Sequence, residues 1–183
     1  MRDIKADIFN CGRSLFMSKG FKNTNVRDIT AMTGVGAGTF YKYYTSKDKL
    51  FLEIYIKENE ELKKHLMESV NINDDPASLA VKIVTYNINA INSNLILKES
   101  YNRELFSKLE KNVYEQSGSE SIDELIREWR ADGKIRNDLD DAMIIAILNS
   151  IRYIDIHKNE IGIRHFPQVL YYITEFIMKS LVK

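Results

Sequence analysis

The chain has 183 residues, with 26 lysines and arginines, 26 aspartates and glutamates and 44% hydrophobic residues, so its formal net charge is zero and it can bury a core. No apolar run approaches the ~20 residues that a membrane helix needs, and the first residues lack the apolar core of a signal peptide, so we expect no membrane partner. The single cysteine, Cys11, excludes an internal disulfide and fits a reducing compartment, so we expect a cytoplasmic protein.

Positive charge is concentrated in the first fifty residues. They contain nine lysines and arginines against four aspartates, an excess of five positive charges, and the rest of the chain carries the balancing negative excess. A basic segment joined to an acidic one suggests a polyanionic partner for the basic segment alone. An ordinary solvated surface explains so modest an excess equally well.

Hydrophobic spacing predicts an all-α fold. Two prolines are present in the whole chain, and apolar residues recur every three or four positions. The first predicted helix covers 2–19 and places Cys11 among its core residues. Gly12 costs this helix about 1 kcal/mol against alanine, which suggests that another helix crosses closely there. Gly20 is expected to end the helix.

A short helix is predicted over 24–34, directly before the unusual sequence GVGAGTFYKYYTSKDKL. Either Thr24 or Asn25 can cap it, and Gly34 ends it. The glycines therefore follow a helix, whereas a dinucleotide-binding loop follows a strand and a P-loop ends in Gly-Lys-Ser/Thr. A helix, a tight turn and a second short helix are typical of a helix-turn-helix.

The second short helix has two expected faces. Phe40 and the turn residue Val35 would face the core, and we expect Tyr43 and Tyr44 to be core residues as well. The opposite face would present Ala37, Gly38, Thr39, Tyr41 and Lys42 to a DNA groove. Hydroxyls on that face can bond phosphate oxygens, and its lysine can reach a base edge or a phosphate. Ser46 is the expected cap of the next helix.

The stretch GFKNTNVRDITAMTGVGAGTFYKYYTSKDKLF resembles the DNA-binding head of the TetR (tetracycline-repressor-like) family of transcriptional regulators, over about 8–55. The resemblance implies an all-helical homodimer that represses transcription until a small molecule binds, with a DNA-binding head over 1–46 and a ligand-binding and dimerisation body over 47–183. The residues that it implies contact DNA are Thr24, Arg27, Thr39, Tyr41, Lys42 and Lys47. Gly36 stands where the family often has a serine cap, and Ala37 where a polar residue is frequent.

The later helices follow from their caps and apolar stripes. A long helix from Lys47 to about Val70 joins the head to the body, and Glu53 lies four residues before Lys57, as in a helical ion pair. Further helices are expected over 76–92, 94–103, 104–114, from a serine cap near 117–121 to Gly133, and over 140–158 and 167–181.

The last two of these helices, 140–158 and 167–181, contain more apolar residues than one monomer can bury. Two such helices from each of two subunits would form a four-helix interface, so we expect a homodimer. Its two heads would then reach major grooves about one turn, ~34–36 Å, apart on a near-palindromic double-stranded DNA operator.

A pocket for a small-molecule effector of open identity is expected among the helices of the body. The candidate lining residues combine aromatic faces with neutral hydrogen-bonding groups; they are Tyr86, Asn89, Tyr101, Phe106, Trp129 and Tyr153. Residues of these types are more often ordinary core residues than ligand contacts.

No sequence pattern indicates catalysis. His65, His157 and His165 lack the spacing of a metal site, and there is no nucleophile-elbow serine. We therefore expect no enzyme, no catalytic residue, no metal and no cofactor. Two functions stay open: a ligand-responsive DNA-binding repressor, or a helical protein-interaction module with weak or lost operator binding, which the glycines of the second short helix favour.

Overall fold

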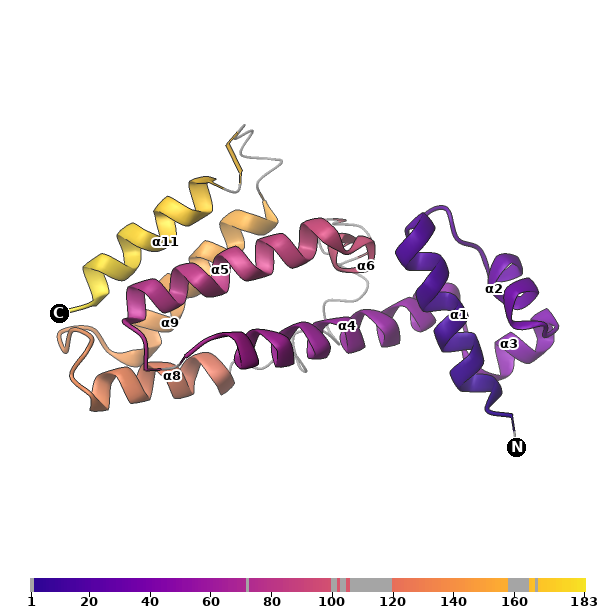
Figure 1. Ribbon diagram of the computed structural model, residues 1–183, viewed down its shortest axis with the longest axis horizontal. Helices are drawn as coiled ribbons and strands as arrows, with labels where there is room; N and C mark the ends of the chain where they lie inside the picture. The colour runs from indigo at the N-terminus through magenta and orange to yellow at the C-terminus, as the bar shows by residue number, and fades with distance from the viewer. Residues whose placement is uncertain are drawn as a thin grey trace. The chain divides into compact units, whose positions relative to one another are not determined.

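The structure, a computed structural model, describes residues 2–71, 73–99, 102, 105, 120–157, 165–166 and 168–183. Within these residues the regular elements are α-helices, so the predicted all-α fold is confirmed. The helices of this part, labelled in Figure 1, are α1 (Ile4–Lys19), α2 (Val26–Thr33), α3 (Ala37–Tyr43), α4 (Lys47–Ser69), α5 (Pro76–Ser93), α6 (Leu95–Lys98), α8 (Glu120–Ala131), α9 (Asp141–Ile156) and α11 (Gln168–Leu181).

The chain divides into two compact units. The head unit takes in Met1–Lys63 with Ala90–Gln116, and the body unit takes in Lys64–Asn89 with Ser117–Lys183. Helices α4 and α5 therefore contribute residues to both units. The predicted division of roles between 1–46 and 47–183 stays a prediction, because compactness does not report on roles.

Helices α1, α2, α3, α4 and α6 share one core in the head unit. Its fully buried residues include Ile8 and Phe16 of α1, Phe40 of α3, and Ile96 of α6. The predicted close crossing at Gly12 is confirmed, because a Cβ atom there would lie 2.8 Å from Cδ2 of Leu50 in α4. Residues well beyond the helix-turn-helix thus complete the core behind it.

The end of α1 is closed by aromatic packing. Gly20 has a φ of 76°, which lets the chain leave the helix, and Phe21 then folds back. The Phe21 ring lies 5.9 Å from that of Phe16 and 4.9 Å from that of Phe51 in α4, measured between centroids. This packing fixes the loop that leads into α2.

The body unit contains α8, α9, α11 and most of α5. Ile126 and Trp129 of α8, Ile144 of α9 and Met178 of α11 lie in one buried cluster with Leu79 of α5. An isolated antiparallel bridge between 135 and 182 ties the end of α11 to the loop after α8. None of the described helices combines the length and the apolarity needed to cross a lipid bilayer.

Of the helices predicted between 94 and 121, one has a different end in the structure and one falls outside the described residues. The helix predicted over 94–103 is wrong in length, because α6 ends at Lys98 and the amide of Asn102 instead bonds the carbonyl of Glu99 at 2.9 Å in a tight turn. The helix predicted over 104–114 falls outside the described residues, as does the serine cap expected near 117–121.

Candidate nucleic-acid interface

Helix α2 is capped at both ends by local chemistry. The Asn25 side chain accepts a hydrogen bond from the amide of Asp28 at 2.9 Å, and the Asp28 carboxylate accepts one from the amide of Asn25 at 3.1 Å. This reciprocal capping box decides between the two predicted caps in favour of Asn25. Gly34 ends the helix in the left-handed region with a φ of 73°, which allows the tight turn that follows.

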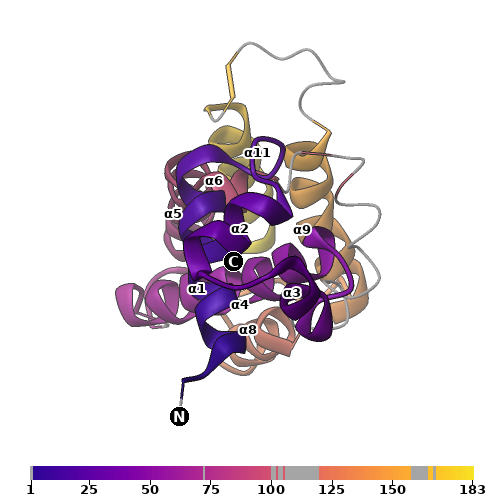
Figure 2. The same cartoon turned by 90° about the vertical axis from the view of Figure 1, so that its right-hand side faces the viewer.

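Helix α3 follows after three residues, 34–36, and packs against α2. Figure 2 shows both helices at the end of the head unit that faces the viewer. Gly36 precedes it and supplies no side-chain cap. Phe40 is fully buried, and Val35 packs against the same core, as predicted. Tyr44, directly after the helix, is only 4% exposed, which confirms its predicted place in the core.

The outer face of α3 is open. Tyr41 is 54% exposed, Lys42 is exposed, and Thr39 is half-buried. A Cβ atom on Gly36 or Gly38 would meet no other atom within 4 Å. The backbone at these two positions is therefore open to close approach by another molecule.

Tyr43 corrects one prediction. It was expected in the core, but it is 43% exposed. Tyr43 is the last residue of α3, and the chain then turns to an extended conformation at Tyr44, which places the Tyr44 ring and not the Tyr43 ring on the buried side with Phe40. The exposed aromatic surface of α3 therefore includes two tyrosines, at 41 and 43.

Arg27 is exposed on α2, at the start of the same helix-turn-helix. The described part of the structure gives its side chain no ion pair. Its guanidinium is thus available to a phosphate oxygen.

Thr24 is placed differently from the prediction. Its side chain is 1% exposed, and Oγ1 donates a hydrogen bond to the carbonyl of Gly20 at 2.9 Å. The hydroxyl that was expected to contact DNA therefore stabilises the loop between α1 and α2. A direct contact would have to come from the backbone.

The Lys47 side chain also makes hydrogen bonds within the head unit. Its Nζ donates to the carbonyl of Phe21 at 2.7 Å and to that of Thr24 at 2.8 Å, and lies 3.9 Å from the centroid of the Phe21 ring. Burial lowers the pKa of this ammonium group. Since an ammonium group has three hydrogens, at most one is left for a phosphate. The main role of this side chain is therefore to stabilise the loop between α1 and α2, and the predicted phosphate contact is secondary to it.

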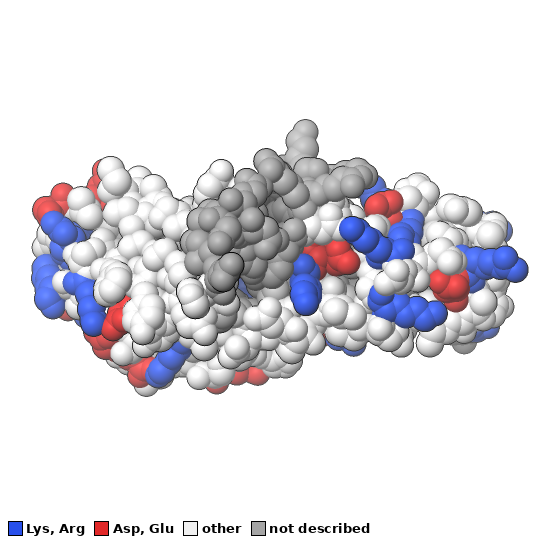
Figure 3. Space-filling model, turned by 90° about the horizontal axis from the view of Figure 1, so that it is seen from above, with Lys and Arg blue, Asp and Glu red and all other residues white. Residues whose placement is uncertain are grey.

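Basic side chains lie on the outside of the head unit. Lys22, Lys42 and Lys49 are exposed together with Arg27. On the face drawn in Figure 3, lysine and arginine atoms are spread over this unit, with fewer acidic atoms between them. The excess of positive charge in the first fifty residues is thus available at the surface.

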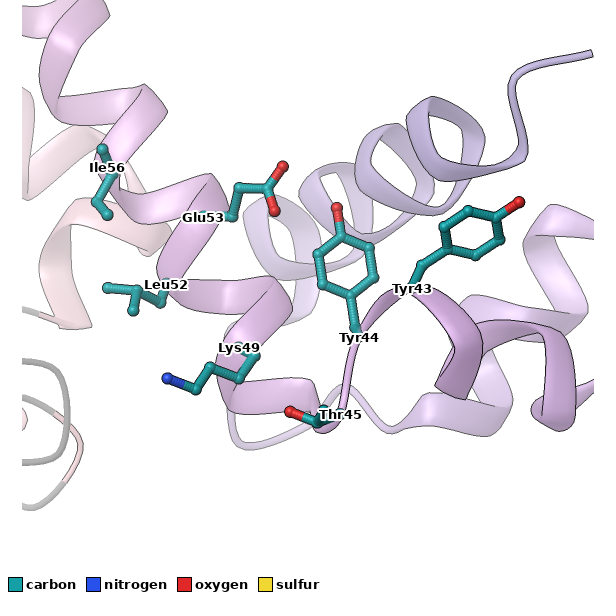
Figure 4. Close-up of a pocket in the computed structure, with 7 residues that line it drawn as sticks. All are labelled: Tyr43, Tyr44, Thr45, Lys49, Leu52, Glu53 and Ile56. Carbon is teal, nitrogen blue, oxygen red and sulfur yellow. The ribbon is translucent and has the colours of Figure 1, made fainter. Parts of the chain in front are cut away.

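A shallow depression of about 470 Å³ lies beside the end of α3, between Tyr43, Tyr44 and the α4 residues Leu52 and Ile56 (Figure 4). The Tyr44 hydroxyl is covered and makes no hydrogen bond to a described residue, although the Glu53 carboxylate lies beside it. Burial, with the nearby Glu53 charge, raises the pKa of Tyr44 well above its ordinary value. Because this hydroxyl is covered, it is not available to a ligand, and we assign no binding role to the depression.

The predicted effector contacts are scattered in the structure. Trp129 is buried and its Nε1–H has no partner among the described residues, whereas Asn89 is exposed and Tyr86 is half-buried. Tyr153 is 63% exposed and stacks on His157 at 3.9 Å between centroids, so it does not line an interior pocket. Tyr101 and Phe106 lie outside the described residues.

Comparison with known proteins agrees with this geometry. Residues 8–54 match the family model of the bacterial regulatory proteins of the tetR family. Residues 8–54 therefore carry the sequence pattern of the tetR family. No curated protein sequence matches the chain.

Solved structures extend the TetR likeness to the whole chain as a fold. A TetR-family transcriptional regulator from Haemophilus influenzae has a TM-score of 0.62 at 15% identity, covering 99% of this chain and 97% of its own. A TetR-family transcription regulator from Shewanella sp. PV-4 has a TM-score of 0.60 at 20% identity, with both chains covered completely. RolR, solved with resorcinol, has a TM-score of 0.68 at 14% identity, covering 97% of this chain and 87% of its own. The chain therefore has the fold of a TetR-family transcription regulator.

Proposed function

We propose that this TetR-family regulator binds a near-palindromic DNA operator as a homodimer, represses transcription from it, and is released when a small molecule binds the body. The open face of α3 supports the DNA step most directly. Tyr41, Lys42 and Tyr43 point outward there, while Phe40 and Tyr44 hold the helix to the core from behind.

Each exposed group has a chemistry suited to a duplex. Tyrosine hydroxyls bond phosphate oxygens, and Lys42 can reach a phosphate or a base edge. The missing side chains at Gly36 and Gly38 allow the helix to lie deep in the major groove. Arg27 of α2 supplies a further phosphate contact. Such a protein works where the chromosome lies, so we place it in the cytoplasm.

Exposed aromatic residues on α11 support the homodimer. Phe176 is 64% exposed, and Tyr171 and Tyr172 of the same helix are also exposed. Helix α9, which packs against α11, adds exposed Met143 and Tyr153. Large apolar side chains gathered on adjacent helices indicate a protein interface. A second copy of α9 and α11 would cover them.

The effector step has two lines of support. RolR, which has the same fold, was solved with resorcinol, although that finding concerns RolR itself. In this chain, Trp129 Nε1 and Thr174 Oγ1 are buried in the body unit without a partner among the described residues. Unpaired buried donors favour an occupant with hydrogen-bond acceptors.

The test begins with genomic DNA fragments selected on the full-length protein. The affinity of one bound fragment and of a scrambled fragment is then measured by fluorescence anisotropy at 50 and 200 mM salt. We expect a clear preference for the selected fragment and a steep loss of affinity with salt, since phosphate contacts release counterions. Equal, weak binding of both fragments would contradict the proposal.

A protein-interaction module is the second candidate. The observation that favours it is the absence of a side-chain cap at Gly36, which leaves the seven-residue α3 weakly specified. Weak binding of every fragment, together with an intact fold by circular dichroism, would favour this candidate.

A further inference from the structure

Glu58 of α4 is a buried carboxylate in the head unit. Its side chain is 5% exposed, in contrast to the other acidic side chains whose ion pairs the structure describes. A buried carboxylate destabilises a fold unless hydrogen-bond donors surround it. Its partners therefore identify which elements must stay in place together.

Two partners come from different parts of the chain. Arg13 of α1 donates from Nε to Oε1 of Glu58, and its Nη2 lies 3.3 Å from Oε2 of Glu61. Asn94, directly between α5 and α6, donates from Nδ2 to the other oxygen of Glu58 at 2.7 Å. The carboxylate thus bridges α1 and the start of α6.

Asn94 has a second role through its other side-chain atom. Oδ1 accepts hydrogen bonds from the amides of Ile96 at 2.9 Å and Leu97 at 3.2 Å, so it caps α6. Because the side-chain amide is planar and rigid, rotating or withdrawing Asn94 breaks the cap and the bond to Glu58 together. The side chains of Ile96 and Leu97 are buried in the core that also contains α1 and α3.

We propose that Glu58 is a positioning residue which, through Arg13 and Asn94, couples the end of α5 and the start of α6 to α1 of the DNA-binding head. A change in α5 that displaces Asn94 leaves the buried carboxylate one donor short and weakens the hold on α1. A role of this coupling in regulation rests on the proposed function. The coupling between Asn94 and α1 can be measured in the protein without DNA.

The test uses an exchange of donor and acceptor. N94D keeps an acceptor for the cap, since aspartate caps as well as asparagine, but it cannot donate to Glu58 and places a second carboxylate beside it. In the double variant E58Q/N94D, the new glutamine amide can donate to the new aspartate, while its oxygen still accepts from Arg13. N94S, which caps but cannot reach Glu58, tests the loss of the bond without the added charge.

Hydrogen exchange of the full-length protein without DNA is the readout. We expect N94D to raise exchange at the Ile96 and Leu97 amides and along 12–16 of α1 by about tenfold or more, N94S to raise it less, and the double variant to return most of the protection. N25D is the matched control, because Asn25 caps α2 without a described donor bond from its side chain, and it should leave α1 unchanged. Faster exchange in α6 alone, no change in N94D, or no return in the double variant would each overturn the coupling.

A second measurement separates this inference from the proposed function. Binding of a selected genomic fragment should weaken about fivefold or more in N94D and recover in the double variant. If the wild-type protein selects no fragment, the proposed function fails while the exchange experiment still decides the coupling. If the fragment binds N94D as it binds the wild type, Asn94 and Glu58 do not position the head.

Discussion

At the scale of single residues, the structure separates side chains that face outward from those that hold the head together. Arg27, Tyr41 and Lys42 are exposed as the helix-turn-helix pattern predicts. Thr24 and Lys47 instead make hydrogen bonds to backbone carbonyls of the loop between α1 and α2. A sequence motif predicts which residue type stands at each position. Which acceptor a polar side chain such as that of Thr24 or Lys47 bonds depends on the groups that the fold places near it.

Lys47→Met should lower the free energy of unfolding by about 2 kcal/mol, because two hydrogen bonds from a charged donor are lost. Urea denaturation measures the change. Lys49→Met is the matched control, since Lys49 is exposed on the same helical turn, and it should change stability by less than about 0.5 kcal/mol. Equal stability of the two variants would show that the Lys47 bonds contribute nothing.

Tyr44→Phe should remove an alkaline loss of stability. Burial raises the pKa of Tyr44 in the folded state above the ordinary value of about 10, so its neutral form stabilises the fold fully below that pH. This contribution is lost as pH rises above about 10, because the unfolded chain then ionises freely. Unfolding free energies between pH 8 and 11 should decline in the wild type and in the control Tyr43→Phe, and less in Tyr44→Phe. Parallel profiles for all three proteins would contradict this.

At the scale of elements, two glycines in helices have opposite reasons for being glycine. Gly12 of α1 lies against Leu50 of α4, where a side chain has no room. Gly38 of α3 has open space around it on the face that we assign to DNA. Glu53 shows the same dependence on neighbouring elements: its spacing predicts an ion pair with Lys57 of the same helix, yet it pairs with Lys5 of α1 at 2.9 Å.

Gly12→Ala should destabilise the head by about 1 kcal/mol. Overpacking against the buried Leu50 costs about 1–3 kcal/mol, and the better helix propensity of alanine returns about 1 kcal/mol. Gly38→Ala, the control without a clash, should stabilise α3 by up to about 1 kcal/mol. Thermal unfolding of both variants measures this difference, and a stabilised Gly12→Ala would show that α1 and α4 can move apart.

At the scale of the whole molecule, the compact units do not follow the order of residues along the chain. Residues 90–97 return to the head unit and place Ile96 and Leu97 in its core, although α5 begins in the body unit. The body unit leaves the aromatic residues of α11 exposed. The first feature links α6 to the head, and the second supplies the surface that the proposed homodimer would cover.

If the proposed homodimer forms through α9 and α11, Phe176→Glu should weaken it at least about tenfold, because a charge would replace a large apolar side chain in that interface. Sedimentation velocity over a range of concentrations measures the shift from dimer to monomer. Met67→Glu is the control, since Met67 is an exposed apolar residue on α4, and it should leave the dimer intact. A Phe176→Glu protein that stays dimeric would place the interface elsewhere.

The sequence by itself determined the helical fold, the capped α2, the turn at Gly34 and the buried Phe40, because each follows from apolar spacing or backbone preferences within a few residues. It also determined that Gly12 marks a helix crossing, since a mid-helix glycine has a local cost that needs a reason. Only the tertiary structure decided that Lys47 braces a loop, that Tyr43 is exposed and that Glu58 joins Arg13 to Asn94. Those outcomes depend on atoms far apart in the chain, and local periodicity contains no information about which of them meet.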